Sequence, residues 1–178
     1  NIFLEECNND NLRFNNGSFK GVINSKEIKK NDIFFAIKGK KKDGNNYIKD
    51  AYRNGAQIAV GSKKLTSNFK NYINVKEPLK LLEKVSKINR QASDSIFIGI
   101  TGSCGKTSLK EMTKYVFKTF TSISASEKSF NNKYGVPLSL FNFNNNNFYG
   151  VYEIGMDKKG EIDALSKIIQ PDIGIITN

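Results

Sequence analysis

The sequence predicts an α/β protein with two domains, the second of which has a doubly wound, mostly parallel sheet. Three observations lead to this prediction. Short apolar runs alternate along the chain with segments of helical periodicity. One of these runs, residues 96–100, leads directly into a glycine-framed turn and a second helical segment. The 178 residues, 38% of them hydrophobic, are enough to build one large or two small cores.

The first half of the chain reads as a small α/β domain. The predicted strands are residues 19–23, 33–37, 57–60 and 72–75, and the predicted helices are 47–53 and a longer one that begins at Pro78. Residues 1–17 are polar and are predicted to have little regular structure. The helix from Pro78 has apolar residues at helical spacing, which predicts a core-facing stripe of Leu79, Leu82, Val85 and Ile88. Its end predicts a domain boundary, with one domain at 1–92 and the other at 93–178.

The second half continues the alternation. The predicted strands are residues 96–101, 122–124, 148–154 and 173–177, and the predicted helices are 107–120, 138–141 and 160–169. We expect the strand at 173–177 to be buried. We expect the helix at 107–120 to bury four apolar residues, Leu109, Met112, Val116 and Phe120.

Residues 101–108, called here the phosphate loop, have the composition of a nucleotide-binding turn. Gly102 and Gly105 permit a tight turn whose N–H groups can surround phosphate oxygens, and the following helix adds the positive end of its dipole. Lys106 can reach the outer phosphates, and the Thr107 hydroxyl can bind Mg²⁺. The predicted nucleotide-binding residues are Thr101, Gly102, Ser103, Cys104, Gly105, Lys106, Thr107 and Ser108.

Glu153 is the second candidate for chemistry. It lies near the end of the predicted strand 148–154, and the carboxyl ends of parallel strands meet at one edge of a sheet. We therefore expect Glu153 to hold Mg²⁺ beside the phosphate loop, the alternative being a carboxylate that contacts only solvent. Asn131 and Asn132 precede the helix 138–141 and either cap it or contact phosphate or substrate.

Charge is distributed unevenly along the chain. The formal net charge is +11, and residues 1–92 contain 19 of the 28 basic and 9 of the 17 acidic residues. Only three of the basic residues are arginines, and no basic motif is interleaved with aromatic residues. This argues against nucleic acid as a partner and is compatible with a small anionic substrate.

Other features exclude several classes of protein. The chain has two distant cysteines, Cys7 and Cys104, and no histidine, which argues against a zinc site and a disulfide framework. Without a histidine base, Cys104 is interpreted as a loop residue rather than a nucleophile. No apolar stretch is long enough to span a membrane, and residue 1 is Asn rather than Met. We expect a cytoplasmic protein of which this chain is a fragment.

Several motifs, in the same order, resemble those of the Mur ligases. Residues 101–112 resemble the ATP loop of that family, and Asn131-Asn132 ahead of residues 135–138 and Glu153 ahead of residues 160–162 also match. Upstream, residues 24–26, 31–39 and 43–44 resemble the family's uridine-nucleotide domain. The loop followed by Lys-Glu-Met is most similar to that of members that add D-alanyl-D-alanine to UDP-N-acetylmuramoyl-tripeptide.

The resemblance implies an ATP- and Mg²⁺-dependent amide ligase of peptidoglycan precursor synthesis, monomeric and not inserted in a membrane. ATP would phosphorylate the tripeptide carboxylate, and the amine of D-alanyl-D-alanine would attack the acyl phosphate. Lys106, Glu153 and Asn132 would be catalytic. Asn131 would bind the nucleotide with the loop, and Thr107 and Glu153 would hold Mg²⁺. Ser25 and Lys26 would contact UDP-N-acetylmuramoyl-tripeptide.

The sequence departs from the family pattern at three places. Lys26 stands where arginine is common, Asn45 where histidine is common, and residues 157–158 where Asn-His is common. The family's downstream histidine, carbamylated lysine and C-terminal domain would follow Asn178, so we expect the fragment alone not to ligate. Two alternatives stay open. One is the Mur ligase that adds the third peptide residue, and the other is a non-catalytic nucleotide-binding module.

Overall fold

The computed structural model describes residues 3, 19–65, 69, 71–127 and 130–178. The chain forms two compact units that divide between Val85 and Ser86, within helix α3 (Pro78–Gln91). The roles assigned to the two domains stay predictions. Cys7 and most of the polar stretch 1–17 lie outside the described residues. No helix in the described part is long and apolar enough to cross a membrane.

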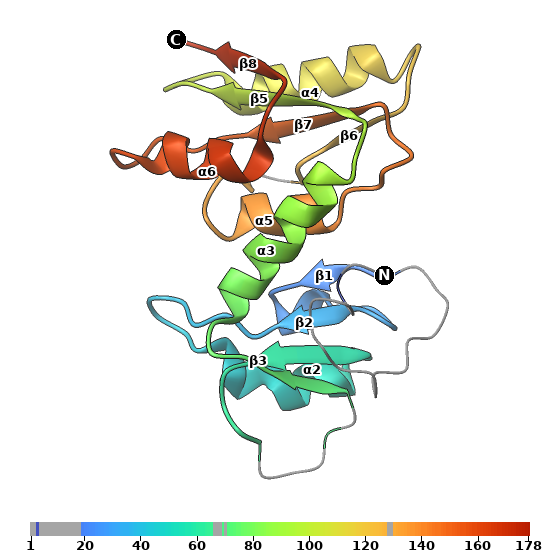
Figure 1. Ribbon diagram of the computed structural model, residues 1–178, viewed down its shortest axis with the longest axis vertical. Helices are drawn as coiled ribbons and strands as arrows, with labels where there is room; N and C mark the ends of the chain where they lie inside the picture. The colour runs from blue at the N-terminus through green and yellow to red at the C-terminus, as the bar shows by residue number, and fades with distance from the viewer. Residues whose placement is uncertain (1–2, 4–18, 66–68, 70, 128–129) are drawn as a thin grey trace. The chain divides into compact units, whose positions relative to one another are not determined.

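Unit 1 is built on a four-stranded parallel sheet in which every strand lies beside its neighbour in sequence (Figure 1). The strands are β1 (Gly21–Val22), β2 (Ile33–Phe35), β3 (Ile58–Gly61) and β4 (Tyr72–Asn74). A 3₁₀ turn, η1 (Ser25–Glu27), connects β1 to β2. A second one, η2 (Gly44–Tyr47), leads into helix α2 (Ile48–Arg53) before β3.

The core of unit 1 lies on both faces of this sheet. Phe34 and Ala59 pack with Ile48 and Ala51 of α2. The residues that alternate with them are also buried, namely Ile33, Phe35, Ile58 and Val60. These strands are apolar throughout because both of their faces are covered.

Unit 2 contains a second parallel sheet, with the strand order β6-β7-β5-β8. Its strands are β5 (Ile96–Thr101), β6 (Ile123–Ala125), β7 (Tyr149–Glu153) and β8 (Ile173–Ile176). Its helices are α4 (Lys106–Phe117), α5 (Gly135–Phe141) and α6 (Glu161–Ile169). The strand β5 therefore lies between two strands that follow it in the chain.

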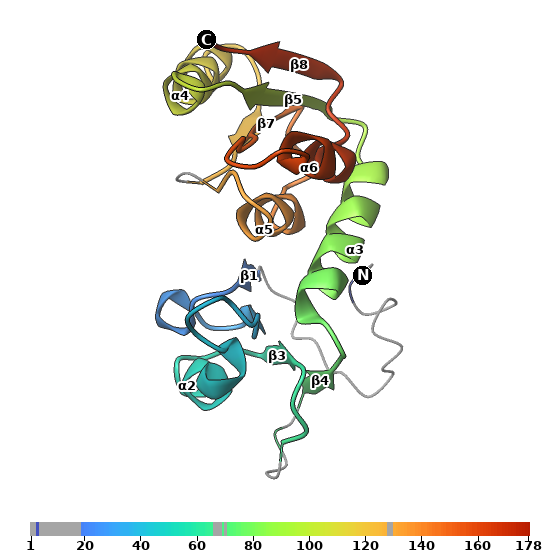
Figure 2. The same cartoon turned by 90° about the vertical axis from the view of Figure 1, so that its left-hand side faces the viewer.

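Helices cover both faces of the second sheet (Figures 1 and 2). On one face, Ile98 and Ile100 pack with Leu109 and Phe117 of α4. The other face packs with α5 and α6 through a cluster of Phe97, Val136, Leu140, Tyr152, Ile154, Leu165, Ile168 and Ile169. The predicted α/β class with parallel sheets is confirmed, and in unit 2 the helices lie on both sides as expected.

Two expectations about burial were wrong. In α4, Met112 is 64% exposed and Val116 is exposed as well, whereas Lys110 is fully buried. The helix ends at Phe117 rather than at the predicted residue 120, and Phe120, which lies beyond it, is also exposed. The phosphate loop fixes the residue at which the helix begins and therefore which of its faces packs on the sheet. That face contains Leu109 and Phe117. The strand β8 is largely exposed rather than buried, because it is an edge strand of the described sheet.

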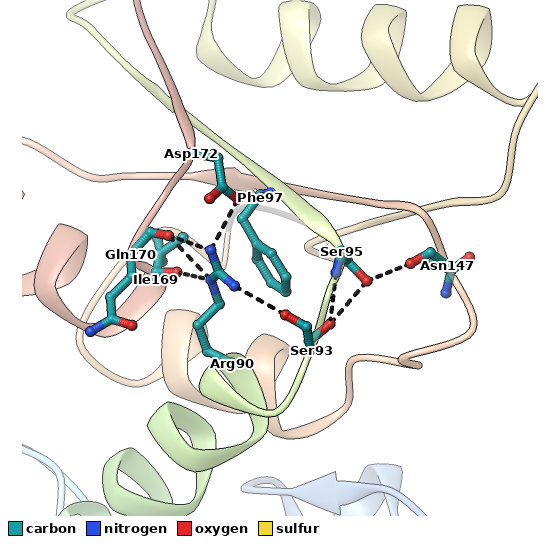
Figure 3. Close-up of polar contacts among 8 residues, drawn as sticks. All are labelled: Arg90, Ser93, Ser95, Phe97, Asn147, Ile169, Gln170 and Asp172. Carbon is teal, nitrogen blue, oxygen red and sulfur yellow. Dashed lines mark hydrogen bonds and ion pairs between the residues drawn. The ribbon is translucent and has the colours of Figure 1, made fainter.

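Arg90, at the end of α3 and within unit 2, makes several contacts with other elements of that unit (Figure 3). Its guanidinium lies 4.1 Å from the centre of the Phe97 ring. It donates hydrogen bonds to the carbonyls of Ile169 and Gln170 at the end of α6, at 2.9 and 2.8 Å, and pairs with Asp172 at 3.0 Å. This one side chain thus joins the last turn of α3, the end of α6 and the strand β5.

Candidate active site

The phosphate loop joins β5 to α4. Gly102 and Gly105 have φ angles of 138° and 78°, which disfavour any residue with a side chain. A Cβ atom on Gly102 would also overlap Thr177, the residue that follows β8. The Thr177 hydroxyl lies within hydrogen-bonding distance of the carbonyls of Thr101 and Cys104. Glycine at position 102 therefore allows the end of β8 to contact the loop.

The other loop residues are accessible from solvent. Ser103, Cys104, Thr107 and Ser108 are exposed. The Lys106 ammonium turns back toward the loop and donates to the carbonyl of Gly102. Lys106 is the first residue of α4, one residue earlier than the predicted start of this helix, and its contact with phosphate stays a prediction.

Glu153 ends β7 beside the phosphate loop, because β7 pairs with β5 in a register that places Glu153 opposite Ile100. The residue is 2% exposed. One carboxylate oxygen accepts a hydrogen bond from the Thr107 hydroxyl at 2.8 Å, and the other accepts one from the Asn131 amide at 2.8 Å. The structure therefore brings together the two side chains that the sequence predicted as Mg²⁺ ligands.

The two adjacent asparagines have different contacts. Asn131 contacts Glu153 through its amide, and its main-chain carbonyl accepts a hydrogen bond from the N–H of Gly155 at 2.7 Å. The Asn132 side-chain oxygen instead accepts from the N–H groups of Tyr134 and Gly135 at 3.0 and 3.1 Å. Asn132 thus holds the start of α5, which is the capping alternative, while Asn131 belongs to the site.

The donor set fits a magnesium ion that is bound together with a nucleotide. Magnesium prefers oxygen ligands and is commonly held by one or two protein groups plus phosphates and water. The Glu153 carboxylate and the Thr107 hydroxyl are such ligands, and both hydrogen-bond donors to Glu153 are neutral, so neither balances its buried charge. Among the described residues, no cluster of three or more His, Cys, Asp or Glu side chains could hold a metal by itself.

The residues predicted to contact the uridine nucleotide lie in unit 1 on η1, directly after β1. Ser25 is buried, and its carbonyl accepts a hydrogen bond from the Asn54 amide at 2.8 Å. Lys26 is exposed, and its N–H donates to the Asn24 side chain at 3.2 Å. The main chain of this turn is therefore fixed, while the Lys26 ammonium extends into solvent.

Asn45, which replaces the histidine common in the family pattern, has a structural role here. It is 7% exposed; its amide nitrogen donates to Asp43 at 2.7 Å, and its oxygen accepts from the Ser62 N–H at 2.8 Å. The hydrogen bond from Asn45, together with Lys63 at 2.9 Å, lowers the pKa of Asp43 to about 2. The start of η2 is thus joined to the residue that follows β3.

Two residues near the site were not predicted, Thr177 and Lys110. Thr177 follows the carboxyl end of β8, and ligands of parallel sheets bind at the carboxyl ends of the strands. This general property of parallel sheets could have identified Thr177 from the sequence. Lys110 is fully buried in α4, close in sequence to the phosphate loop. Lys110 belongs to the stretch 101–112 that resembles the family's ATP loop, but nothing in that stretch indicates a buried side chain, because lysine is usually on the surface.

Two family models match this chain. Residues 22–91 match the model described as "Mur ligase family, catalytic domain", and residues 100–178 match the "Mur ligase middle domain". Two curated relatives are the UDP-N-acetylmuramoyl-tripeptide–D-alanyl-D-alanine ligases of Rickettsia prowazekii, at 38% identity, and Bacillus subtilis, at 31%. Both alignments cover 88% of this chain and 35% of the relative. The chain thus spans about a third of the length of these relatives.

Two solved structures of similar fold are ligases of the same kind as these curated relatives. The chain superposes on MurF ligase from Thermotoga maritima in complex with ADP, with a TM-score of 0.75 and 33% identity, covering 88% of this chain and 36% of that one. It superposes on a crystal structure of MurF from Acinetobacter baumannii with a TM-score of 0.86 and 26% identity, covering 98% and 39%.

Proposed function

Because the chain belongs to the Mur ligase family, we propose that its protein is an ATP-dependent amide ligase that joins D-alanyl-D-alanine to UDP-N-acetylmuramoyl-tripeptide. The names of the relatives support this choice of substrates. The observation that carries the proposal is the hydrogen bond between Thr107 and Glu153, beside the phosphate loop. The reaction belongs to peptidoglycan precursor synthesis. In line with the expectation from the family resemblance, we place the enzyme in the cytoplasm, as a monomer.

In the proposed reaction, the carboxylate of the tripeptide attacks the γ-phosphorus of ATP, and ADP leaves. The amine of D-alanyl-D-alanine then attacks the resulting acyl phosphate, an amide bond forms, and inorganic phosphate is released. Neither step uses a protein nucleophile. The protein therefore acts by positioning the reactants and by balancing negative charge.

Each site residue has a defined task in this proposal. Lys106 and the N–H groups of the phosphate loop bind the ATP phosphates. Thr107 and Glu153 hold Mg²⁺, which, when bound, draws negative charge from the phosphate oxygens. Asn131 orients the Glu153 carboxylate, consistent with the hydrogen bond between them. Ser25 and Lys26, on the predicted uridine-nucleotide domain, contact the tripeptide substrate.

The alternatives are less well supported. The ligase that adds the third peptide residue is not favoured, because the curated relatives described above join D-alanyl-D-alanine. A non-catalytic module would bind ATP without turning it over. The proposal and the two alternatives therefore predict different substrate requirements for the release of phosphate from ATP.

The test uses the full-length protein and measures phosphate release from ATP. We expect release only when UDP-N-acetylmuramoyl-tripeptide and D-alanyl-D-alanine are both present. Glu153→Gln should lower kcat by about 100-fold or more, because the carboxylate that would hold Mg²⁺ is lost, and with it the positive charge that stabilises the reacting phosphates. Glu77→Gln, which breaks an exposed ion pair with Lys80 in unit 1, is the matched control. Release without the dipeptide, or with a single amino acid in its place, would refute the proposed acceptor.

A further inference from the structure

Lys110 of α4 is fully buried and has no task in the proposed mechanism. Lysine is almost never fully buried unless its ammonium is paired. Lys110 lies one helical turn beyond Lys106 and Thr107, so the three side chains project from neighbouring positions on the helix. A buried ammonium this close to a nucleotide site calls for a physical role.

The Lys110 ammonium has contacts both outside α4 and within it. The Lys110 ammonium donates to the carbonyl of Ser126 at 2.9 Å, in a bond that is itself buried. It also pairs at 3.2 Å with Glu111, whose side chain is 54% exposed. The contact with Ser126 is the one that reaches the protein interior, since Ser126 is 3% exposed.

Ser126 lies directly after β6 and hydrogen-bonds to the end of β7, where Glu153 lies. Its N–H donates to the carbonyl of Val151 at 2.9 Å, and its hydroxyl accepts a long hydrogen bond of 3.5 Å from the Glu153 N–H. The position of Ser126 therefore affects the main chain of β7 at Glu153.

We propose that Lys110 is a positioning residue for the magnesium site, which acts by fixing the end of β6 against the end of β7. Its ammonium holds the Ser126 carbonyl, and Ser126 in turn hydrogen-bonds to the main chain of Val151 and Glu153. The inference rests on the proposed function, because it requires Glu153 to bind Mg²⁺. Groups that hydrogen-bond to a metal ligand commonly change metal affinity by about 10-fold to 100-fold when they are removed, and for Lys110, which acts through Ser126, we expect the lower end of this range.

The experiment measures ADP binding to the full-length protein by calorimetry, once with excess Mg²⁺ and once with excess EDTA. In Lys110→Met, the apolar stem is kept and the ammonium is lost. We expect the Kd for ADP in EDTA to stay within about twofold of wild type, and the tightening produced by Mg²⁺ to fall by about 10-fold or more. Lys118→Met, which removes an exposed lysine after the same helix, should leave both values unchanged.

The outcomes separate this inference from the proposed function. If ADP binding to the wild-type protein is insensitive to Mg²⁺, the proposed metal site fails, and the inference fails with it. If the wild-type protein responds and Lys110→Met responds equally, only the inference is overturned. Equal weakening of ADP binding with and without Mg²⁺ would also overturn it, because the lysine would then support the fold and not the metal.

A second variant covers the case in which Lys110→Met does not fold, as judged by thermal unfolding. Ser126→Ala removes the hydroxyl that accepts the hydrogen bond from the Glu153 N–H, so it should also reduce the Mg²⁺-dependent tightening. An unchanged response in Ser126→Ala would overturn the proposal. Where both variants fold, the double variant should match the single ones within about twofold, because the two residues act on the same route.

Discussion

Asp43 shows how single residues fix the shape of unit 1. Its carboxylate accepts hydrogen bonds from the side chain and from the N–H of Asn45 and pairs with Lys63. These contacts stabilise the ionised form, so the pKa of Asp43 falls from its ordinary value of 3.8 to about 2. The same carboxylate caps η2. A single charge thus fixes the turn that contains Asn45, the position at which the family pattern commonly has a histidine.

This arrangement predicts a pH dependence of stability. A carboxylate whose pKa is lowered in the folded state contributes stability above its unfolded pKa and loses that contribution as the pH falls toward the folded value. Asp43→Asn should therefore lower the unfolding temperature at about pH 6, and the difference from wild type should shrink between about pH 4 and pH 2. Asp50→Asn, which breaks an exposed ion pair with Arg53, should have little effect at either pH. A difference between Asp43→Asn and wild type that stays constant across this range would contradict the prediction.

Among the helices, α5 depends on the residues that precede it. Six of its seven residues are buried, and its first residue is Gly135, where a Cβ atom would lie 2.6 Å from the Cα atom of Phe130. The first N–H groups of a helix have no partner within the helix. Asn132 accepts hydrogen bonds from two such groups, those of Tyr134 and Gly135.

We therefore expect Asn132→Ala to weaken the fold and not nucleotide binding. Loss of a capping side chain costs about 1 kcal/mol of stability. Urea unfolding should show this loss in the free energy of unfolding, and the Kd for ADP with Mg²⁺ should stay as in wild type. If Asn132→Ala is as stable as wild type but has lost catalytic turnover, the role predicted from the sequence is correct and the capping role is not the main one.

The elements also show what periodicity can and cannot predict. In β2, β3 and β5, continuous apolar residues predicted strands, and the structure has strands there whose residues are mostly buried on both faces. In α4, apolar residues occupy more than one side of the helix, so their spacing could not show which side meets the sheet. In β8, apolar composition suggested burial, but burial depends on neighbouring elements, and the described sheet ends at this strand.

The same distinction applies to the site. The proximity of Thr107 and Glu153 could be predicted, because it follows from a general property of parallel sheets. The difference between Asn131 and Asn132 could not, because two adjacent, identical side chains give the same pattern and only their contacts distinguish them. Their chemical roles, like those of the phosphate loop, stay predictions until the proposed experiments are done.

For the whole molecule, the two units have separate sheets and separate cores. Within unit 2, Arg90 joins three elements through its guanidinium, of which only a small part is exposed. The planar group donates in several directions at once, which a lysine cannot do. Arg90 is therefore the single side chain of the described residues from which we expect the broadest effect on unit 2.

Hydrogen exchange can test this expectation. Arg90→Ala should remove about 2–3 kcal/mol of stability from unit 2, because hydrogen bonds to a charged group are lost. Protection of backbone amides should fall in β5, α6 and β8 and stay unchanged in β1 to β4. Arg53→Ala, which removes an exposed arginine in unit 1, serves as the control. Equal protection of unit 2 in Arg90→Ala and wild type would show that the contacts of Arg90 are not needed for the stability of unit 2.

The strand order in the two units has a consequence for synthesis on the ribosome. In unit 1, each new strand can pair with the strand made just before it. In unit 2, β5 is made first, but its two partners, β7 and β8, are made last. Contacts between residues distant in sequence form slowly and leave strand edges open in the meantime. The phosphate loop is therefore made early but its neighbouring strands are added late, and of the two units, unit 2 is the one that most needs protection from aggregation during synthesis.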